Sequence, residues 1–415
     1  MYKDVDWSKL VERYTTAYGQ TIDPVALFDD ALHGGTAGLE RFKKAYVFGP
    51  EDSGAFERWE AKNSFLTRIW ACWCGIDQLG FEQKLLKTML DRSRSEGMTY
   101  IEYRCGSGID GFMDWHPFCA QTLMEHSDDE MTARYILSMS REEPLKTYEL
   151  LLQILDEQPE LVPCIVGVDF CGAEEGFPPK DMRPFFLSWQ AENRLHPNRA
   201  LDVVYHVGES YFDKSLESAV RWCHEVAEMG ALRLGHAIAL GLDPVIAVAR
   251  RPHAHEEELV AERLDQIEYD LRHSAILARY GIEVDQKALE NERAELEIKD
   301  SQAKVHRVYD DKRLQEIRRR QDMVLDQLIE LGTVIECCPN SNLRIGGVPA
   351  PEHHPLHRFL RSQVNLVICS DDPGNMDAPL ASEVEWVVKH TNMNARMLEE
   401  RLGDPRRFRL GLGRK

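Results

Sequence analysis

Seven short apolar runs recur between residues 99 and 370 and predict β-strands. Helical patterns separate most of them, for example Glu143–Gln158 and Lys214–Gly230. This alternation predicts a parallel sheet, and nearly continuous apolar strands indicate burial on both faces. A closed (β/α)8 barrel needs eight strands, whereas an open doubly wound sheet tolerates seven, so the pattern alone leaves both architectures open. The runs are Thr99–Arg104, Arg134–Arg141, Pro163–Cys171, Leu201–Val207, Ala231–His236, Thr333–Cys338 and Val364–Ser370.

Two regions fall outside this alternation. The first ninety residues predict mainly helices, with helical spacing over Asp6–Tyr18 and Phe65–Leu90. Residues 250–331 are charged and helical, and they lengthen the gap between two strands beyond one β/α connection. We interpret them as a helical insertion within a single domain spanning residues 1–415. Plain packing or homo-oligomerisation is the favoured role for the insertion, and a cap over the substrate is the alternative.

Charge and cysteine content narrow the class of protein. With 50 Lys and Arg against 70 Asp and Glu, the formal charge is −20, which disfavours binding to a nucleic-acid duplex. No apolar run is long enough to span a bilayer, and the first residues lack a signal-peptide pattern. The ten cysteines contain no CxxC pair, so neither a zinc ribbon nor a thioredoxin motif is expected. We therefore expect a reduced, cytoplasmic protein without a membrane partner.

Polar residues follow several predicted strands at their carboxyl ends, where barrel enzymes place active sites. His206 and Glu209 follow one strand, His236 ends the next, and Asp371 and Asp372 follow the last. Each has a plain structural alternative, because such residues also make turns, cap helices or pack in cores. Together they would bring imidazole and carboxylate groups to one mouth. That combination suits a Zn²⁺-like ion that generates hydroxide near neutral pH.

Five motifs in order resemble the adenosine deaminase family, the adenosine/AMP deaminase branch of the metal-dependent amidohydrolases. The resemblance covers about residues 99–376 and implies a (β/α)8 TIM-type barrel with a helical insertion between its sixth and seventh strands. Ala237 stands where the family motif has Gly. The motifs are Val168–Gly172, His206–Glu209, Arg233–Ala237, Glu336–Asn342, and His354-Pro355 with Val364–Pro373.

The resemblance implies a role for each matching residue. His206 and Asp371 would be zinc ligands, and Asp371 would also hold the attacking hydroxide. Glu209 would donate a proton to the purine ring nitrogen beside the attacked carbon. His236 would orient or deprotonate the attacking water. The implied enzyme is a zinc-dependent hydrolase that deaminates a 6-aminopurine and releases ammonia, with one zinc ion per chain.

The same resemblance assigns substrate contacts. Asp372 would bind the imidazole side of the purine, and Gly172 would contact the base through its backbone. An adenine nucleoside and an adenine nucleotide both remain open as the small-molecule partner. Arg344 is a candidate for binding the phosphate of a nucleotide.

One family element has no match in the sequence. The family's first barrel strand ends in a His-x-His pair that supplies two zinc ligands, and the only such pair here is His253-Ala254-His255 in the charged insertion. We expect that pair to start a solvated helix, and we expect the missing strand to lie upstream. Residues 407–412 have some strand character and are a weaker candidate to fill the gap. The alternative function is a catalytically impaired or silent relative that acts through its helical insertion.

Overall fold

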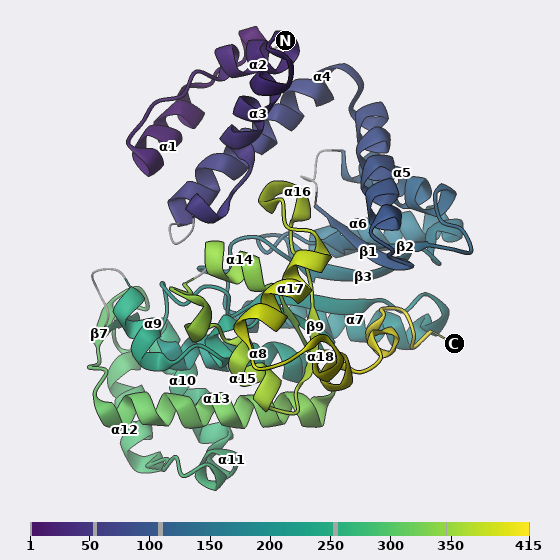
Figure 1. The fold of residues 1–415 in the computed structure, drawn as a ribbon. Coiled ribbons are helices and arrows are strands. Elements are labelled where there is room, and N and C mark those ends of the chain that lie inside the picture. Colours follow the sequence, from purple (N-terminus) through teal and green to yellow (C-terminus); the bar gives the residue numbers. More distant parts are fainter. Residues whose placement is uncertain (1, 53–55, 107–110, 252–255, 346, 415) are drawn as a thin grey trace.

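The computed structural model describes residues 2–52, 56–106, 111–251, 256–345 and 347–414. Seven parallel strands form one sheet in the order β1-β2-β3-β4-β5-β8-β9 (Figure 1). All seven predicted strands are present, and each lies within a few residues of its predicted run. The strands are β1 (Tyr100–Cys105), β2 (Thr132–Ser138), β3 (Ile165–Phe170), β4 (Asp202–Val207), β5 (Arg233–His236), β8 (Val334–Cys337) and β9 (Asn365–Ile368).

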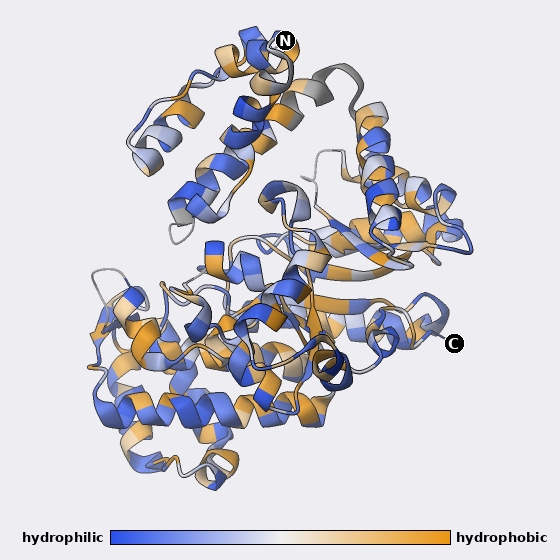
Figure 2. Cartoon of the chain, viewed as in Figure 1, coloured by the Kyte–Doolittle hydropathy of each residue, from blue (hydrophilic) through white to orange (hydrophobic). Residues whose placement is uncertain are grey.

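One face of this sheet is apolar and is covered by helices. Side chains alternate along each strand, so Tyr135, Val168 and Tyr205 share the apolar face and are at most 1% exposed. Figure 2 shows hydrophobic and hydrophilic residues alternating along the covering helices. The helices that pack around the sheet are α5 (Phe112–Glu125), α6 (Pro144–Glu157), α7 (Arg183–Leu195), α8 (Leu216–Met229), α13 (Asp311–Leu331), α15 (Leu356–Arg361) and α17 (Leu380–His390).

The N-terminal helices form a separate apolar cluster above the sheet in Figure 1. Trp7, Phe28 and Phe65 pack there as tilted and edge-on aromatic pairs. The long helix α4 leads from this cluster to β1, and the predicted Phe65–Leu90 helix is its central part. The helices are α1 (Ser8–Tyr18), α2 (Pro24–His33), α3 (Gly35–Tyr46) and α4 (Phe56–Ser95).

The charged region between β5 and β8 is helical, as predicted, and lies at the lower edge of Figure 1. It also contains a small antiparallel sheet of two strands, β6 (Glu257–Leu259) and β7 (Lys304–His306), which the sequence did not predict. Its last helix, α13, packs along α8 of the sheet layer. The assignment of residues 250–331 as an insertion within one domain of residues 1–415 stays a prediction. The other helices are α9 (Pro244–Arg250), α10 (Val260–Arg272), α11 (Ser274–Arg279) and α12 (Gln286–Glu297).

The C-terminal segment covers the sheet at the starts of its strands. Residues 405–408 form a 3₁₀ helix, and the strand character expected for residues 407–412 does not produce a strand. Leu410 packs instead against Ile136, Val166 and Val204. Its backbone N–H donates to a carboxylate oxygen of Glu102 at 2.8 Å.

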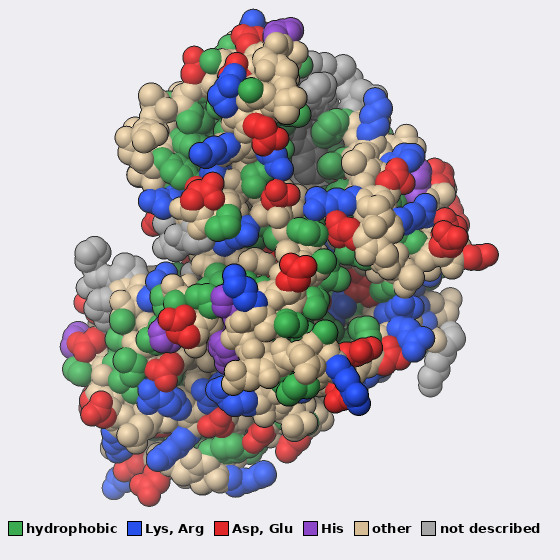
Figure 3. Space-filling model, in the orientation of Figure 1, with side chains coloured by type: hydrophobic (Ala, Val, Ile, Leu, Met, Phe, Trp, Pro, Cys, Tyr) green, Lys and Arg blue, Asp and Glu red, His purple; other side chains and the backbone are tan. Residues whose placement is uncertain are grey.

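Two observations concern the cysteines and the hydropathy of the helices. Every cysteine whose side chain the structure describes is a free thiol. Within the described ranges, no helix is both long and apolar enough to cross a membrane. Figure 3 shows acidic and basic side chains interspersed over the visible face.

The face of the sheet opposite the helices carries a buried network of charges. Arg104 pairs with Glu336 at 2.5 Å and with Asp169 at 3.3 Å. Arg233 pairs with Glu102 and, at 3.0 Å, with Glu336. Burial alone would raise the pKa of Glu336, but the two guanidinium groups outweigh it and lower that pKa. The network thus ties β1 to three strands that lie far from it in the sequence.

Replacing Arg233 with Met tests this network. The change leaves Glu102 without its guanidinium partner and should lower the free energy of unfolding by about 3 kcal/mol or more. The measurement is chemical denaturation followed by circular dichroism. The matched control is Arg396→Met, because Arg396 pairs with Glu400 at the surface and should change stability by less than about 0.5 kcal/mol. Equal stabilities of the two variants would contradict a stabilising role of the network.

Candidate active site

His206 lies at the carboxyl end of β4 and is held from three sides. Its Nδ1 lies 3.0 Å from Asp169 Oδ1, so an N–H at Nδ1 donates to the carboxylate and Nε2 keeps a lone pair. Gly235 lies against the ring, and a Cβ there would sit 2.9 Å from His206 Cγ. Arg141 donates to the carbonyl oxygen of His206 at 2.7 Å. This arrangement fixes the ring with its second nitrogen available as a ligand.

The pKa of Asp169 supports that arrangement. Burial of this carboxylate acts to raise its pKa, but His206 and Arg104 outweigh burial and lower the pKa. Asp169 therefore stays ionised over the physiological pH range and remains an acceptor for the imidazole N–H.

His236 ends β5 in the left-handed region, with φ of 64°. Its Nδ1 lies 2.9 Å from Asn342 Oδ1, and its Nε2 lies 3.7 Å from Glu209 Oε2. Burial acts to lower the pKa of His236, whereas the carboxylates of Glu209 and Asp371 and the bond to Asn342 raise it to about 9. The imidazole is thus fixed through one nitrogen, while the other faces an acid.

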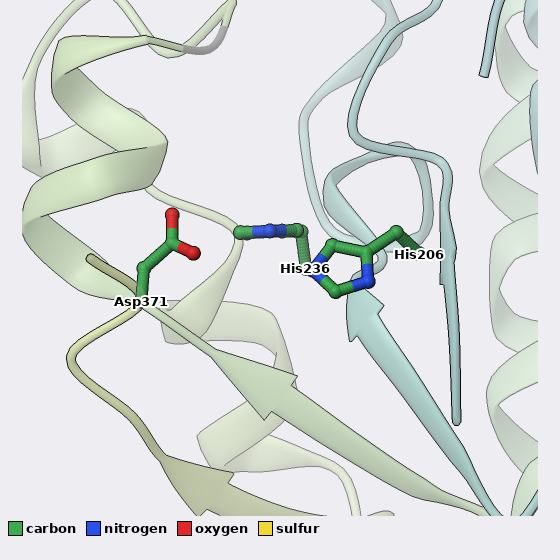
Figure 4. Close-up of side chains that lie close together, drawn as sticks. All are labelled: His206, His236 and Asp371. Carbon is green, nitrogen blue, oxygen red and sulfur yellow. The ribbon is translucent and has the colours of Figure 1, made fainter. Parts of the chain in front are cut away.

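Asp371 completes a group of three possible metal ligands. It has a φ of 54° and accepts a hydrogen bond from Ser341 Oγ at 2.5 Å. One donor atom from each of His206, His236 and Asp371 lies within 4.8 Å of the others. In Figure 4 the imidazole of His236 lies between the other two side chains. Two imidazoles and a carboxylate are a donor set typical of Zn²⁺, so the residues present fit such an ion.

Glu209 lies on the loop that follows β4. The loop is held by Glu174, a buried carboxylate that accepts backbone N–H groups from Gly208 at 2.9 Å and from Ser210 at 2.5 Å. Gly208 has a φ of 67°, and a Cβ at this position would lie 2.6 Å from Cys223 Sγ. Only glycine satisfies both constraints without displacing its neighbours, so Gly208 is required for the path of this loop.

The two residues expected to contact substrate both follow strands of the sheet at their carboxyl ends. Gly172 follows β3, the strand next to β4, and has a φ of 82°. Asp372 follows Asp371 and caps helix α16 (Pro373–Met376) by accepting the N–H of Asn375 at 2.9 Å. The cap is the alternative role that an Asp at a strand end was expected to have.

Arg344, the expected phosphate ligand, contacts backbone carbonyl groups in this structure. It is buried, and its Nη1 donates to the carbonyl oxygens of Phe48 at 3.1 Å and Met376 at 2.5 Å. The side chain therefore joins the N-terminal helices to the loop after β9. The His253-Ala254-His255 pair lies outside the described residues.

Sequence reasoning missed the residues that position the group. Asp169, Ser341 and Asn342 all lie inside motifs that were read for other residues. The role of Asp169 follows from the strand periodicity, because it shares a sheet face with His206 on the neighbouring strand. Glu174 carried no signal, because its partners are backbone groups of another loop.

Comparison with known proteins bears on the family. Residues 304–402 match the adenosine deaminase family model. The adenine deaminase of Rhizobium leguminosarum bv. trifolii is 42% identical over 62 residues, which are 15% of this chain and 19% of that protein. The adenosine deaminase-like protein of Drosophila melanogaster is 41% identical over 59 residues, or 14% and 18% of the two chains. These matches confirm the resemblance that the motifs predict, although they span less than a quarter of each relative.

Solved structures of deaminases match most of the chain at low sequence identity and with TM-scores below 0.5. An adenine deaminase from Arthrobacter aurescens is 15% identical with a TM-score of 0.48, over 92% of this chain and 93% of that one. An Arabidopsis ADAL complexed with IMP is 13% identical with a TM-score of 0.49, over 94% of this chain and 91% of that one.

Gly235→Ala tests how the sheet positions His206. The added methyl would push the imidazole away from Asp169, so we expect the affinity for Zn²⁺ to fall by about 10- to 100-fold. Metal content after dialysis against buffered Zn²⁺ measures the effect. Gly413→Ala is the control, because a Cβ there meets nothing within 4 Å. Unchanged metal content in Gly235→Ala would show that the ring does not need this close approach.

Proposed function

We propose that this chain is a zinc-dependent hydrolase that deaminates a 6-aminopurine, either adenine or an adenine nucleoside or nucleotide. The observation that carries the proposal is the placement of an acid, Glu209, 3.7 Å from His236 Nε2 within the candidate metal group. Replacing an amino group on an aromatic ring by oxygen requires a nucleophile on one side and a proton donor at the ring nitrogen. The arrangement offers both, and the family match agrees with this chemistry.

His206, His236 and Asp371 are the residues that would hold the metal. When bound, a Zn²⁺ ion lowers the pKa of water and so supplies the nucleophile at neutral pH. We propose the expected roles, in which His206 and Asp371 are the zinc ligands and His236 orients or deprotonates the water. His236 is a further candidate ligand, because the donor atoms of all three residues lie close together.

The remaining steps belong to residues of the chain. Glu209 donates a proton to the ring nitrogen and neutralises the charge that develops when oxygen adds to the carbon. His236 directs the water through Nε2, since Nδ1 is committed to Asn342. Asp371, held by Ser341, accepts a hydrogen bond from the water. Asp372 and the backbone of Gly172 would hold the base. The proton that the water loses passes through His236 or Asp371 to the amino group, which leaves as ammonia. The remaining hydroxyl proton returns to Glu209 as the carbonyl forms.

A second candidate function is a catalytically impaired relative that acts through its helical insertion. The observation that favours it is the open sheet: among the described strands, β1 pairs only with β2 and β9 pairs only with β8. Such a sheet leaves one side of the metal group without a strand. Homo-oligomerisation through residues 250–331 stays a prediction under either candidate.

Metal content and deamination together separate the two candidates. The purified chain is analysed by elemental mass spectrometry and then incubated with adenine, adenosine and AMP while ammonia release is followed. Retained zinc with ammonia release from any of the three supports the deaminase. Retained zinc with no release from any of them contradicts it and supports the second candidate.

Glu209→Gln tests the proton donor. The amide keeps the size of the side chain but cannot donate an acidic proton, so kcat should fall by about 10²- to 10⁴-fold while zinc is retained. Glu160→Gln is the matched control, because Glu160 is exposed and precedes β3 at the opposite end of the sheet. Deamination at the unchanged rate in Glu209→Gln would remove this residue from the role.

A further inference from the structure

A second cluster of metal-ligating side chains lies between α8 and the insertion. His224 and Glu228 are four residues apart on α8, so they share one helix face, and His273 follows the last residue of α10. One donor atom of each residue lies within 4.8 Å of the others. Both histidines are buried, whereas Glu228 is exposed, which leaves the cluster open to ions from solvent.

The hydrogen bonds of His273 show that the cluster requires a cation. Its Nδ1 lies 2.9 Å from the carbonyl oxygen of Tyr269, which can only accept, so Nδ1 carries a proton. Its Nε2 lies 3.0 Å from Glu228 Oε1. A neutral ring would therefore point a lone pair at a carboxylate. A proton carried by either group, or a metal ion between the two atoms, would remove this repulsion.

His224 is prepared to be a ligand in the same way. Its Nδ1 lies 2.7 Å from the hydroxyl oxygen of Tyr269, so Nε2 is the nitrogen left for a ligand. Burial, helped by the nearby charges of His273 and Arg272, lowers the pKa of His224 to about 4, so the ring is neutral near pH 7. A neutral imidazole with one nitrogen bonded to an oxygen is the usual state of a metal-binding histidine.

The surrounding charges permit a cation. Arg272 is the nearest exposed cation in sequence, but its guanidinium lies 3.7 Å from Glu225 and 3.9 Å from Glu268. The pKa of Glu228 is lowered, because its hydrogen bond to His273 and the charges around it outweigh burial. The site therefore offers a carboxylate and two imidazoles, with the closest arginine directed to other acids.

We propose that His224, Glu228 and His273 bind a divalent transition-metal ion of the Zn²⁺ class that joins the helical insertion to the sheet layer. Two nitrogen donors and one oxygen donor favour such an ion over Mg²⁺ or Ca²⁺, which prefer oxygen ligands alone. Ligand atoms around tetrahedral zinc are about 3.4 Å apart, given bonds of about 2.1 Å. The exposed Glu228 side chain supplies the small movement needed to reach that spacing. Such an ion would fix α10 against α8.

Co²⁺ binding tests the proposal on the full chain. His206→Ala is used as the background, because it removes a ligand of the candidate active site and leaves the second cluster intact. The apo protein is titrated with Co²⁺ and followed by the visible absorption of the tetrahedral ion. We expect one equivalent to bind in His206→Ala, and we expect at least tenfold weaker binding when His273→Asn or Glu228→Gln is added.

The control is His306→Asn in the same background. His306 is exposed and pairs with Glu256 at 2.8 Å at the small β6–β7 sheet. Loss of the His306 imidazole should therefore leave Co²⁺ binding unchanged. Equal Co²⁺ affinity in the background and in both cluster variants would overturn the proposal. Glu228→Gln changes an exposed side chain and is expected to fold, so it decides the question if His273→Asn does not fold.

Thermal unfolding gives a second readout. Saturating Zn²⁺ should raise the melting temperature of the His206→Ala protein by several degrees, because the ion binds only the folded state. The same Zn²⁺ should leave the melting temperature of His206→Ala/Glu228→Gln unchanged. An equal increase in both proteins would place the stabilising ion elsewhere and overturn the proposal.

Discussion

The buried ion pairs inside the sheet are the constraint on which the rest of the structure depends. Charges removed from water are costly unless they are paired, so Glu102, Arg104, Arg233 and Glu336 must meet once their strands are buried. Their meeting fixes which strands face each other across the sheet. Because Arg104 also pairs with Asp169, the same network reaches the imidazole of His206. The position of His206 is thus set by the interior of the fold.

Backbone strain is concentrated at the same place. Among the described residues, His236, Ala237 and Asp371 are three of the four non-glycine residues with positive φ. Such conformations cost about 1–3 kcal/mol each and persist where surrounding contacts impose them. Ala237 stands where the family motif has Gly, and its φ of 47° is a conformation that glycine adopts most easily. The strained backbone aims the donor atoms of two strands at one point.

The sequence predicts the strands well because each is a short apolar run between helical patterns. It also predicts His206, His236 and Asp371 as neighbours, because parallel strands end at a common edge. It did not predict the small β6–β7 sheet, since Glu257 and Lys304 belong to charged strands without an apolar pattern. Contacts such as Arg344 with the carbonyl of Phe48 depend on the path of the backbone, and side-chain patterns carry no information about them.

The second histidine cluster shows the same limit. His224 and Glu228 have the spacing of a helical ligand pair, but the third member, His273, directly follows another helix almost fifty residues later. Only the packing of α10 on α8 brings it near. Local sequence therefore indicates two of the three ligands of such a site, and only the tertiary structure identifies the third.

The contact of Leu410 with Glu102 joins residues 308 positions apart and has a consequence for folding during synthesis. All seven strands of the sheet precede residue 410 in the chain and are therefore made before it. Until then the carboxylate of Glu102 lacks its bond to the tail, and Val166 and Val204 lack their apolar cover. Because translation proceeds at about 5–20 residues per second, the nascent sheet waits in this incomplete state for a time set by the remaining chain. Residues around position 410 thus complete the interior of a sheet whose strand β1 was made some three hundred residues earlier.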